Sequence, residues 1–265
     1  FYCRINGANY FSRGLFNSLP EKRKSCCVRW SLVNILCLYR VYIFMKNYLL
    51  IGASSAMAQA SKSILEDKGH RVIQLSRNPN FSDENVSSYV EDLPSLSDRL
   101  DGLVYFPGTI NLKPFRSLKL EDFQSDFNIH VLGAVNALKA YHSNLNEGSS
   151  VVLISSVAAT MGMPFHASVA SVKSAIEGLG KSLAAEWAPK IRVNVIAPSL
   201  TNTPMAEKLT NTPEKIEAGA QRHPLKRIGS VNDLAESICF LLGENSAWVT
   251  GQVLHVDGGM SRLKV

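Results

Sequence analysis

Cysteine is scarce in most of this chain, and long apolar stretches are missing. Four of the five cysteines (Cys3, Cys26, Cys27 and Cys37) lie in the first 44 residues, so residues 45–265 keep only Cys239. A single cysteine excludes an internal disulfide there and is typical of a reducing compartment. No stretch of 18 uncharged apolar residues occurs, so we expect a cytoplasmic protein without a membrane span.

An excess of charge is also missing from most of the chain. The formal net charge is +6, from 28 basic and 22 acidic residues. Residues 1–44 contain seven of the basic residues and one of the acidic ones, so residues 45–265 hold 21 of each. A formally neutral segment lacks the excess of basic residues that is typical of nucleic-acid binding, and we therefore expect no nucleic-acid partner.

The first 44 residues differ from the rest and show no clear helical or strand period. Met45 then opens a segment that runs directly into an apolar stretch. Three interpretations remain open: upstream sequence that is not part of the folded protein, a basic and acid-poor transit peptide, or a membrane-surface anchor over residues 30–39 that Arg40 interrupts. We expect residues 1–44 to be a leader outside the fold and residues 45–265 to form one domain.

Residues 45–265 alternate short apolar runs with segments of helical period. The runs predict strands at 48–51, 72–75, 89–90, 103–106, 151–154, 193–196 and 253–256. The helical patterns cover 57–65, 123–141, 167–187 and 234–242, and residues 78–101 look too short for a full crossover helix. Apolar strands separated by helices predict an α/β fold, with a doubly wound parallel sheet of about seven strands and helices on both faces.

A turn after the first of these strands is typical of phosphate binding. The spacing Gly52-x-x-x-Ala56-x-Ala58 places a glycine turn before a helix, and such a turn brings backbone N–H groups onto a pyrophosphate. Gly52 permits the tight bend, whereas the methyl group of Ala56 lies where the phosphates approach. A plain strand–helix turn is the alternative interpretation.

The end of the second strand indicates which dinucleotide is preferred. An acidic residue there would accept a hydrogen bond from a ribose 2′-hydroxyl. The chain has Ser76 and Arg77 instead. Because a guanidinium forks onto phosphate oxygens, these residues favour NADP(H) over NAD(H). An arginine in a solvated loop is the alternative.

A series of short motifs along residues 46–260 resembles the short-chain dehydrogenase/reductase family. The motifs follow one another as Gly52-Ala53-Ser54-Ser55, Asp92-Leu93, Tyr105-Phe106-Pro107-Gly108, Ile154-Ser155-Ser156, Arg192-Val193-Asn194-Val195-Ile196-Ala197-Pro198, Thr203, Arg227-Ile228-Gly229, Thr250-Gly251 and Val256-Asp257-Gly258-Gly259. The resemblance implies a Rossmann-like single-domain fold and a homodimer or homotetramer. It also implies that residues 204–223 cover the substrate.

The resemblance further implies hydride transfer between a nicotinamide and a carbonyl or alcohol carbon. Ser156 would hydrogen-bond the carbonyl, and Lys173 would hold the nicotinamide ribose. Asp92 and Leu93, after the third strand, would contact the adenine. The cofactor-binding residues implied are Gly52, Ser54, Ser55, Ala56, Met57, Ser76, Arg77, Asp92, Leu93, Phe106, Pro107, Gly108, Lys173, Pro198 and Thr203.

The sequence departs from the family at two active-site positions. Four residues before Lys173 the family has a tyrosine that acts as general acid and base, and this chain has Val169. The 17 residues between Ser156 and Lys173 match the family spacing, so an alignment slip does not explain the change. His130 stands where the family has asparagine. Valine cannot donate a proton.

Two histidines are candidates to replace the lost proton donor. His166 lies three residues before Val169, and imidazole exchanges protons near neutral pH. The helical period places His130 on the inward face of the long helix. Alternatively, His130 is a hydrogen-bonded core residue and His166 only shapes the pocket. Ser168 and Ser171 are weaker candidates, and Lys173 itself could donate.

The side chains expected at the pocket mouth favour an apolar small-molecule carbonyl or alcohol as substrate; they are Met161, Met163, Phe165, Leu200 and Met205. Packing against the rest of the fold is the alternative interpretation of these side chains. Two functions from different classes follow. The first is an NADP(H)-dependent oxidoreductase in which His166 donates the proton and His130 replaces a relay residue. The second is an inactive NADP(H)-binding protein that serves as a sensor or oligomer partner. Lyase or epimerase chemistry on the same scaffold is a third possibility.

Overall fold

The computed structural model describes residues 3–5, 8–10 and 45–264. The chain divides into two units, residues 1–45 and 46–265. In the first unit, β1 (Cys3–Ile5) and β2 (Ala8–Tyr10) pair antiparallel, a strand pair that the sequence period did not reveal. The expected leader otherwise lies outside the described residues, including the proposed anchor at 30–39.

The second unit contains a seven-stranded, wholly parallel sheet. The strands are β3 (Asn47–Ile51), β4 (Arg71–Ser76), β5 (Glu84–Asn85), β6 (Leu100–Tyr105), β7 (Leu145–Ile154), β8 (Arg192–Pro198) and β9 (Val253–Val256). Their order across the sheet is β5-β4-β3-β6-β7-β8-β9. The order reverses direction between β3 and β6, as a doubly wound sheet requires.

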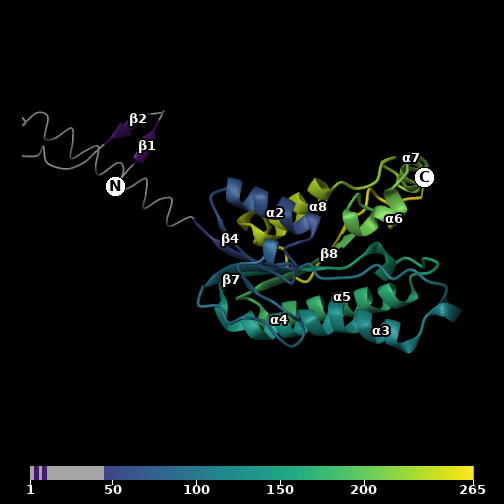
Figure 1. Cartoon of the computed structure of the whole chain (residues 1–265), viewed down its shortest axis with the longest axis horizontal. Helices are drawn as coiled ribbons and strands as arrows, with labels where there is room; N and C mark the ends of the chain where they lie inside the picture. The colour runs from purple at the N-terminus through teal and green to yellow at the C-terminus, as the bar shows by residue number, and fades with distance from the viewer. Residues whose placement is uncertain (1–2, 6–7, 11–44, 265) are drawn as a thin grey trace, which may run out of the picture. The chain divides into compact units, whose positions relative to one another are not determined.

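Helices cover both faces of this sheet (Figure 1). α2 (Ala56–Asp67) and α8 (Val231–Leu242) lie together on one face. α3 (Leu120–Phe127), the π-helical turn η3 (Asn128–Leu132), α4 (Gly133–Tyr141) and α5 (Ala167–Trp187) lie on the other. Two short helices, α6 (Glu207–Thr210) and α7 (Pro213–Gln221), follow β8. Short 3₁₀ turns are η1 (Pro79–Phe81), η2 (Phe115–Ser117), η4 (His142–Asn144), η5 (Val157–Ala159), η6 (Pro204–Ala206) and η7 (Glu244–Ser246).

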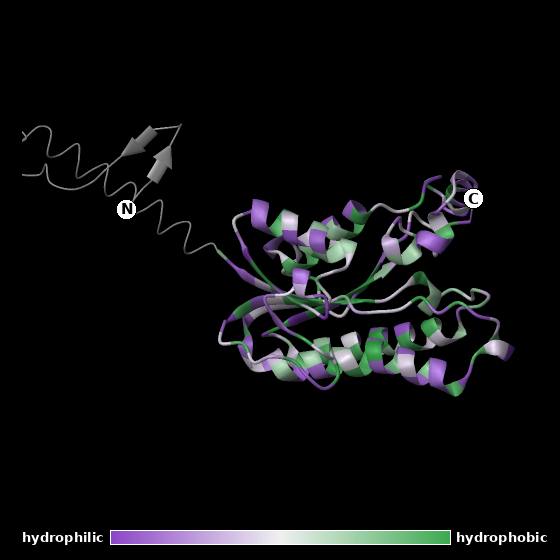
Figure 2. Ribbon diagram, in the orientation of Figure 1, coloured by the Kyte–Doolittle hydropathy of each residue, from purple (hydrophilic) through white to green (hydrophobic). Residues whose placement is uncertain are grey.

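The sheet separates two apolar cores. Leu49 and Ile51 of β3 pack with the side of α4 and α5, whereas Tyr48 and Leu50 pack with α2 and α8. This alternation follows from the two-residue period of a strand, and both faces are apolar because helices cover both. Figure 2 shows that the helices on both faces are amphipathic, with hydrophobic and hydrophilic residues alternating along each helix. The predicted α/β, Rossmann-like class is confirmed.

One predicted strand is wrong. Tyr89 and Val90 do not form the third strand, which is β5 at Glu84–Asn85. The hydroxyl of Ser88 instead accepts from the backbone N–H of Val90 at 3.2 Å, and this local bond turns the chain. Tyr89 is buried because its ring packs edge-on against Tyr105, not because it lies in a strand.

The crossover from β5 to β6 contains no α-helix among the described residues, in agreement with the short length of 78–101. The predicted long helix over 123–141 is interrupted by η3, which contains His130. Within the described residues, no helix is long and apolar enough to cross a membrane.

Candidate active site

A cavity of about 250 Å³ lies beyond the carboxyl ends of the central strands. All four residues proposed as catalytic line it, namely Ser156, Lys173, His166 and His130. Of the proposed cofactor residues, Ser55, Met57, Phe106, Gly108, Lys173, Pro198 and Thr203 also line it. Those that do not are Gly52, Ser54, Ala56, Ser76, Arg77, Asp92, Leu93 and Pro107. The place of the cavity is the one at which doubly wound sheets bind ligands.

The turn after β3 has the geometry of an anion site. Gly52 has a φ of +79°, and its N–H donates to the carbonyl of Leu75 at 2.8 Å. The hydroxyl of Ser55 accepts from the N–H of Ala58 at 3.1 Å and caps α2. The N–H groups of Ala56 and Met57 in the first helical turn have no partner within the helix, and they are free for a phosphate.

Gly52 is also required by a close approach. A Cβ atom at this position would lie 2.8 Å from Cδ of Pro107, which follows β6. The two motif segments after β3 and β6 therefore pack against each other through this glycine, although neither Gly52 nor Pro107 itself lines the cavity.

Arg77 is exposed at the end of β4, with its guanidinium 5.4 Å from the ring centre of Tyr89. This cation–π contact orients the side chain without using its hydrogen-bond donors. Ser76 is buried, and its hydroxyl accepts from the N–H of Asn78 at 3.1 Å. A guanidinium with free donors at this place can bind a phosphate.

Asp92 and Leu93 do not follow the third strand directly, contrary to the expectation from the motif. That strand ends at Asn85, and the turn at Ser88 separates it from Asp92. The carboxylate of Asp92 is exposed and accepts from the hydroxyl of Ser87 at 2.6 Å. Leu93 packs against the core. The segment after the third strand therefore presents Ser87 together with Asp92.

Lys173 is buried on α5, and its Nζ donates to the carbonyl of Ile154 at 2.7 Å. Burial lowers the pKa of Lys173 to about 7, and the nearby carboxylate of Asp126 opposes this shift. The hydroxyl of Ser156 accepts from the N–H of Ala158 at 3.2 Å and lines the cavity. The cavity is therefore lined both by Lys173, whose charge changes near neutral pH, and by Ser156, whose hydroxyl can donate its proton to a ligand.

His130 is 1% exposed and is held in one protonation state. The backbone N–H of Thr109 donates to Nε2 of His130 at 2.9 Å, so the ring proton of the neutral imidazole lies on Nδ1. Burial, with the charge of Lys173, lowers the pKa of His130 to about 3. Nδ1 is buried and has no partner among the described residues. His130 therefore lines the cavity as a neutral imidazole whose Nδ1–H is buried.

His166 precedes α5 and is half-buried at the same cavity. Its Nδ1 lies 2.7 Å from the carbonyl oxygen of Pro164, and a carbonyl can only accept. Nδ1 is therefore protonated, which leaves Nε2 to take up or release a proton. Val169, where the sequence resemblance implies a tyrosine, is buried and also lines the cavity.

The serine alternatives lie away from the cavity. The hydroxyl of Ser168 donates to Oδ2 of Asp126, and the hydroxyl of Ser171 donates to the carbonyl of Ala167 at 2.8 Å. Neither serine lines the cavity. Of the candidate donors, His166 and Lys173 line the cavity.

Sequence reasoning missed Asp126 and Thr109. The hydroxyl of Thr109 donates to Oδ1 of Asp126 at 2.6 Å, and Thr109 lines the cavity. Asp126 is 2% exposed and so belongs to the interior. The available signal was its position four residues before His130, which places both residues on one face of a helix. Arg222, another cavity residue, was also missed.

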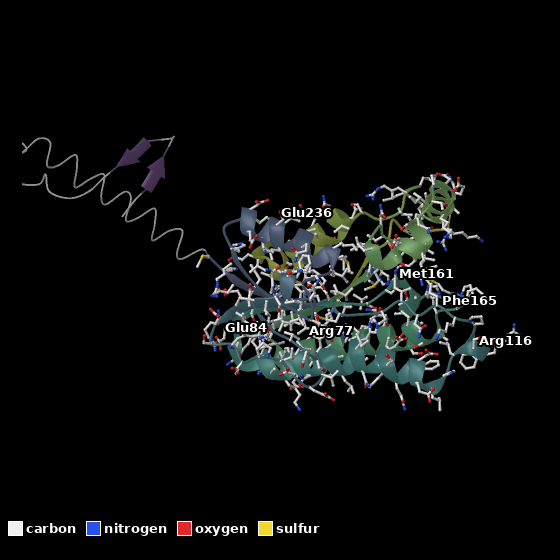
Figure 3. All side chains as sticks on the ribbon, in the orientation of Figure 1. Arg77, Glu84, Arg116, Met161, Phe165 and Glu236 are labelled. Atoms are coloured by element: carbon white, nitrogen blue, oxygen red, sulfur yellow. The ribbon has the colours of Figure 1, made fainter. Side chains whose placement is uncertain are left out.

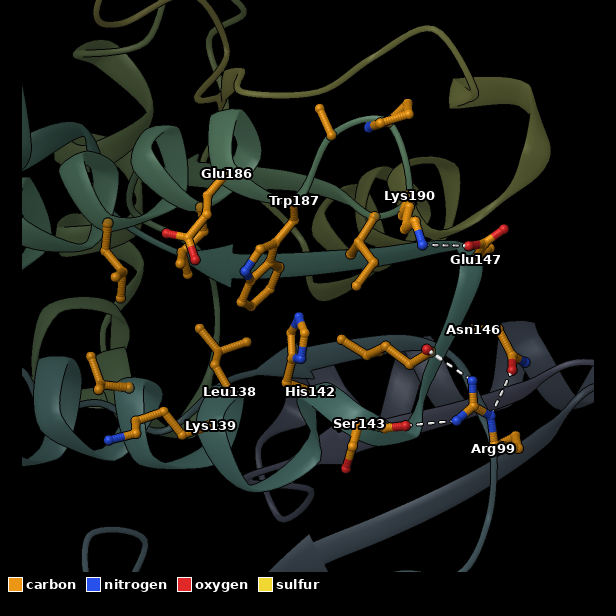
Figure 4. Close-up of a pocket in the computed structure, with 17 residues that line it drawn as sticks. Arg99, Leu138, Lys139, His142, Ser143, Asn146, Glu147, Glu186, Trp187 and Lys190 are labelled. Atoms are coloured by element: carbon orange, nitrogen blue, oxygen red, sulfur yellow. Dashed lines mark hydrogen bonds and ion pairs between the residues drawn. The ribbon is translucent and has the colours of Figure 1, made fainter.

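A larger cavity of about 930 Å³ lies at the opposite edge of the sheet, near the start of β7 and the end of α5. Figure 4 shows His142 facing Trp187 there, with ring centres 4.8 Å apart. The guanidinium of Arg99 is already bonded to Asn146 and to two backbone carbonyls. The cavity contains none of the residues proposed from the motifs, and it lies at the amino ends of the strands.

Comparison with known proteins agrees with this arrangement. A family model described as enoyl-(acyl carrier protein) reductase matches residues 51–261. The chain is 31% identical over 246 residues to the 3-oxoacyl-[acyl-carrier-protein] reductase FabG of Thermotoga maritima. The alignment covers 81% of this chain and 97% of that protein.

Solved structures give the same result. A short chain dehydrogenase family protein from Francisella tularensis superposes with a TM-score of 0.75 at 25% identity, over 83% of this chain and all of that one. The protein ElxO with NADP bound superposes with a TM-score of 0.70 at 25% identity, over 82% of this chain and 99% of that one. The chain belongs to the short-chain dehydrogenase/reductase family.

Proposed function

We propose that this protein is an NADP(H)-dependent oxidoreductase that interconverts a carbonyl and a secondary alcohol, with His166 in place of the usual tyrosine. The observation that supports this most strongly is that Ser156, Lys173 and His166 line one cavity together with Val169, which cannot donate a proton. Hydride transfer is mostly the chemistry of the cofactor, so the protein must orient the reactants and move one proton.

The residues present fit a nicotinamide dinucleotide. The positive φ of Gly52 and the free N–H groups at the start of α2 form a cradle for a pyrophosphate. Arg77 would bind a 2′-phosphate, and Lys173 would hold the ribose next to the nicotinamide. When bound, the cofactor supplies or accepts the hydride. The structure of ElxO with NADP bound, in a similar fold, supports the choice of cofactor.

The chain's own residues would handle the proton. In the reduction direction, the Ser156 hydroxyl donates a hydrogen bond to the carbonyl oxygen and so stabilises the charge that develops there. The imidazolium of His166 then gives its Nε2 proton to that oxygen, while Nδ1–H stays bonded to the carbonyl of Pro164. His130 remains uncharged, because burial lowers its pKa to about 3. In oxidation the same proton returns to His166.

The alternative is a protein that binds NADP(H) without turnover. Val169 favours it, because a hydrocarbon side chain occupies the place of the proton donor. ElxO is also described in a form with tyrosine replaced by phenylalanine and with NADPH bound, so loss of one tyrosine there is compatible with binding.

The two functions are separated by measuring NADPH oxidation over a panel of carbonyl compounds, alongside NADPH binding. The oxidoreductase proposal expects turnover that falls by about 10²–10⁴ in His166→Ala. Val169→Tyr should raise turnover, since it restores a phenol in front of Lys173. Tight NADPH binding without turnover in every variant would support the alternative. Turnover that is unchanged in His166→Ala would refute the donor assignment.

We also propose a cytoplasmic homodimer or homotetramer in which residues 1–44 are not part of the fold. The single cysteine of residues 45–264, Cys239, is a free thiol and suits a reducing compartment. The family resemblance supports assembly through the long helix predicted over 123–141, which comprises α3, η3 and α4, and through α5 and β9. Light scattering of the whole chain and of residues 45–265 would test both points.

A further inference from the structure

One wall of the cavity is apolar and open to solvent. Ile110, Met205 and Leu209 line the cavity and are nevertheless 42%, 51% and 38% exposed. Leu112, Met163 and Leu200 complete this wall. Met161 and Phe165, also expected at the pocket mouth, do not line the cavity. Figure 3 shows them on the segment after η5, toward the same end of residues 46–264 as Arg116. Large apolar side chains exposed around a concave site mark a binding groove for an apolar ligand.

The charge of the cavity has one sign. None of its described lining residues is an aspartate or glutamate. Apart from the histidines, its ionisable groups are Lys173, which is buried, and Arg222, which is exposed. Within residues 45–264, the guanidinium of Arg222 makes no hydrogen bond or ion pair. An arginine with five unused donors beside an acid-free cavity is suited to a carboxylate or phosphate.

The position of Arg222 is fixed by its neighbours. His223 is buried, with Nδ1 2.7 Å from the carbonyl oxygen of Gly219 and Nε2 2.8 Å from the hydroxyl of Ser199. Gly219 packs so closely that a Cβ atom there would lie 2.8 Å from Cδ2 of Leu200. The last turn of α7 is therefore attached to the segment after β8. Arg222, which directly follows α7, is held at the cavity.

We infer that the substrate has an apolar chain and an anionic group, and that Arg222 binds the anionic group while the apolar wall binds the chain. The inference rests on the proposed function only for the reacting carbonyl. A polyol fits this wall poorly, because its hydroxyl groups need several hydrogen-bond partners and the wall offers hydrocarbon and thioether groups. Two parts of the cavity have different roles. The start of α2 would bind the phosphates of the cofactor, and Arg222 would bind the substrate.

Binding of unreactive ligands tests this without requiring turnover. Decanoate, decyl phosphate and 1-decanol share one chain and differ in the head group. We would titrate each by calorimetry into the full-length protein, with and without NADPH. The expected result is binding of both anions about tenfold tighter than binding of decanol. Stronger binding of decyl phosphate than of decanoate, or the reverse, identifies which anion is preferred.

Arg222→Gln should remove the preference for the anions and leave decanol binding unchanged. Lys226→Gln is the matched control, since Lys226 is exposed four residues later and does not line the cavity; it should retain the preference. The inference would be overturned by equal binding of all three ligands, or by a preference that survives in Arg222→Gln. Weaker NADPH binding in Arg222→Gln with an intact anion preference would also overturn it, because the guanidinium would then belong to the cofactor. Absence of turnover on every carbonyl would refute the hydride-transfer proposal and leave the anion preference standing.

Discussion

The backbone N–H of Thr109 donates to Nε2 of His130, and the hydroxyl of the same residue donates to the buried carboxylate of Asp126. Ser168, directly before Val169, donates to the other oxygen of that carboxylate. One carboxylate therefore joins the segment after β6 to the first turn of α5. Since Thr109 sets the tautomer of His130, this cluster determines which ring nitrogen of His130 carries the proton.

Removal of the Asp126 carboxylate should destabilise the fold. In Asp126→Ala the hydroxyls of Thr109 and Ser168 lose their acceptor in the interior, which we expect to cost about 2–4 kcal/mol of unfolding free energy. Asp126→Asn keeps one acceptor oxygen and should cost less than half of that. Urea unfolding would measure both. Asp67→Ala, at the exposed end of α2, is the control. Equal stability of Asp126→Ala and the control would contradict a structural role for the cluster.

Gly52→Ala should be more harmful than an alanine at another glycine with the same backbone angle. Gly52 and Gly69 have φ values of +79° and +80°, so both substitutions carry the strain of a left-handed conformation, about 1 kcal/mol. Only at Gly52 does the added Cβ meet Pro107, whereas nothing lies within 4 Å of a Cβ at Gly69. We expect Gly52→Ala to lower the melting temperature further and to weaken NADPH binding. Identical melting temperatures of the two variants would show that the contact with Pro107 relaxes without cost.

The sequence predicts those parts of the site that depend on local spacing. The turn at Gly52 and the helix that contains Lys173 follow from apolar period and motif order, and both lie where expected. The short apolar run of Tyr89 and Val90 predicts a strand, yet the hydroxyl of Ser88 turns the chain there. A local hydrogen bond outweighed the apolar pattern.

Contacts between distant segments could not be predicted in the same way. Asp126 interrupts the apolar face of its helix, and only the arrival of Thr109 and Ser168 from other elements explains its burial. Arg222 is an exposed residue directly after α7, outside the helical period that buries Gly219 and Ala220. Its place at the cavity depends on the anchor between His223 and Ser199.

Arg77→Gln should change the preference between the two dinucleotides. If Arg77 binds a 2′-phosphate, its loss should weaken NADPH binding by about 10- to 100-fold, the effect of one to two charge-assisted hydrogen bonds, and leave NADH binding unchanged. Arg71→Gln is the control, because Arg71 lies at the opposite end of the same strand and pairs with Asp98. Fluorescence titration with both dinucleotides would measure the ratio. If the ratio of NADPH to NADH affinity stays constant in Arg77→Gln, Arg77 does not bind the 2′-phosphate and is only a solvent-exposed loop residue.

The buried charge of Lys173 predicts a specific dependence of stability on pH. Burial lowers its pKa from 10.5 to about 7, so between pH 7 and 10.5 the unfolded chain binds a proton at Lys173 that the folded chain does not. Stability from this residue therefore increases as the pH rises through that interval, and it is lowest below pH 7, where the buried amine is charged.

Lys173→Met removes the titrating group and keeps the volume. Its unfolding free energy relative to the wild type should be most favourable near pH 6.5, and this advantage should decrease toward pH 9.5. Lys62→Met, on the surface of α2, should show no such trend. A constant difference between Lys173→Met and the wild type across this range would mean that Lys173 keeps its charge when buried, and the carboxylate of Asp126 would then be the counter-ion that maintains it.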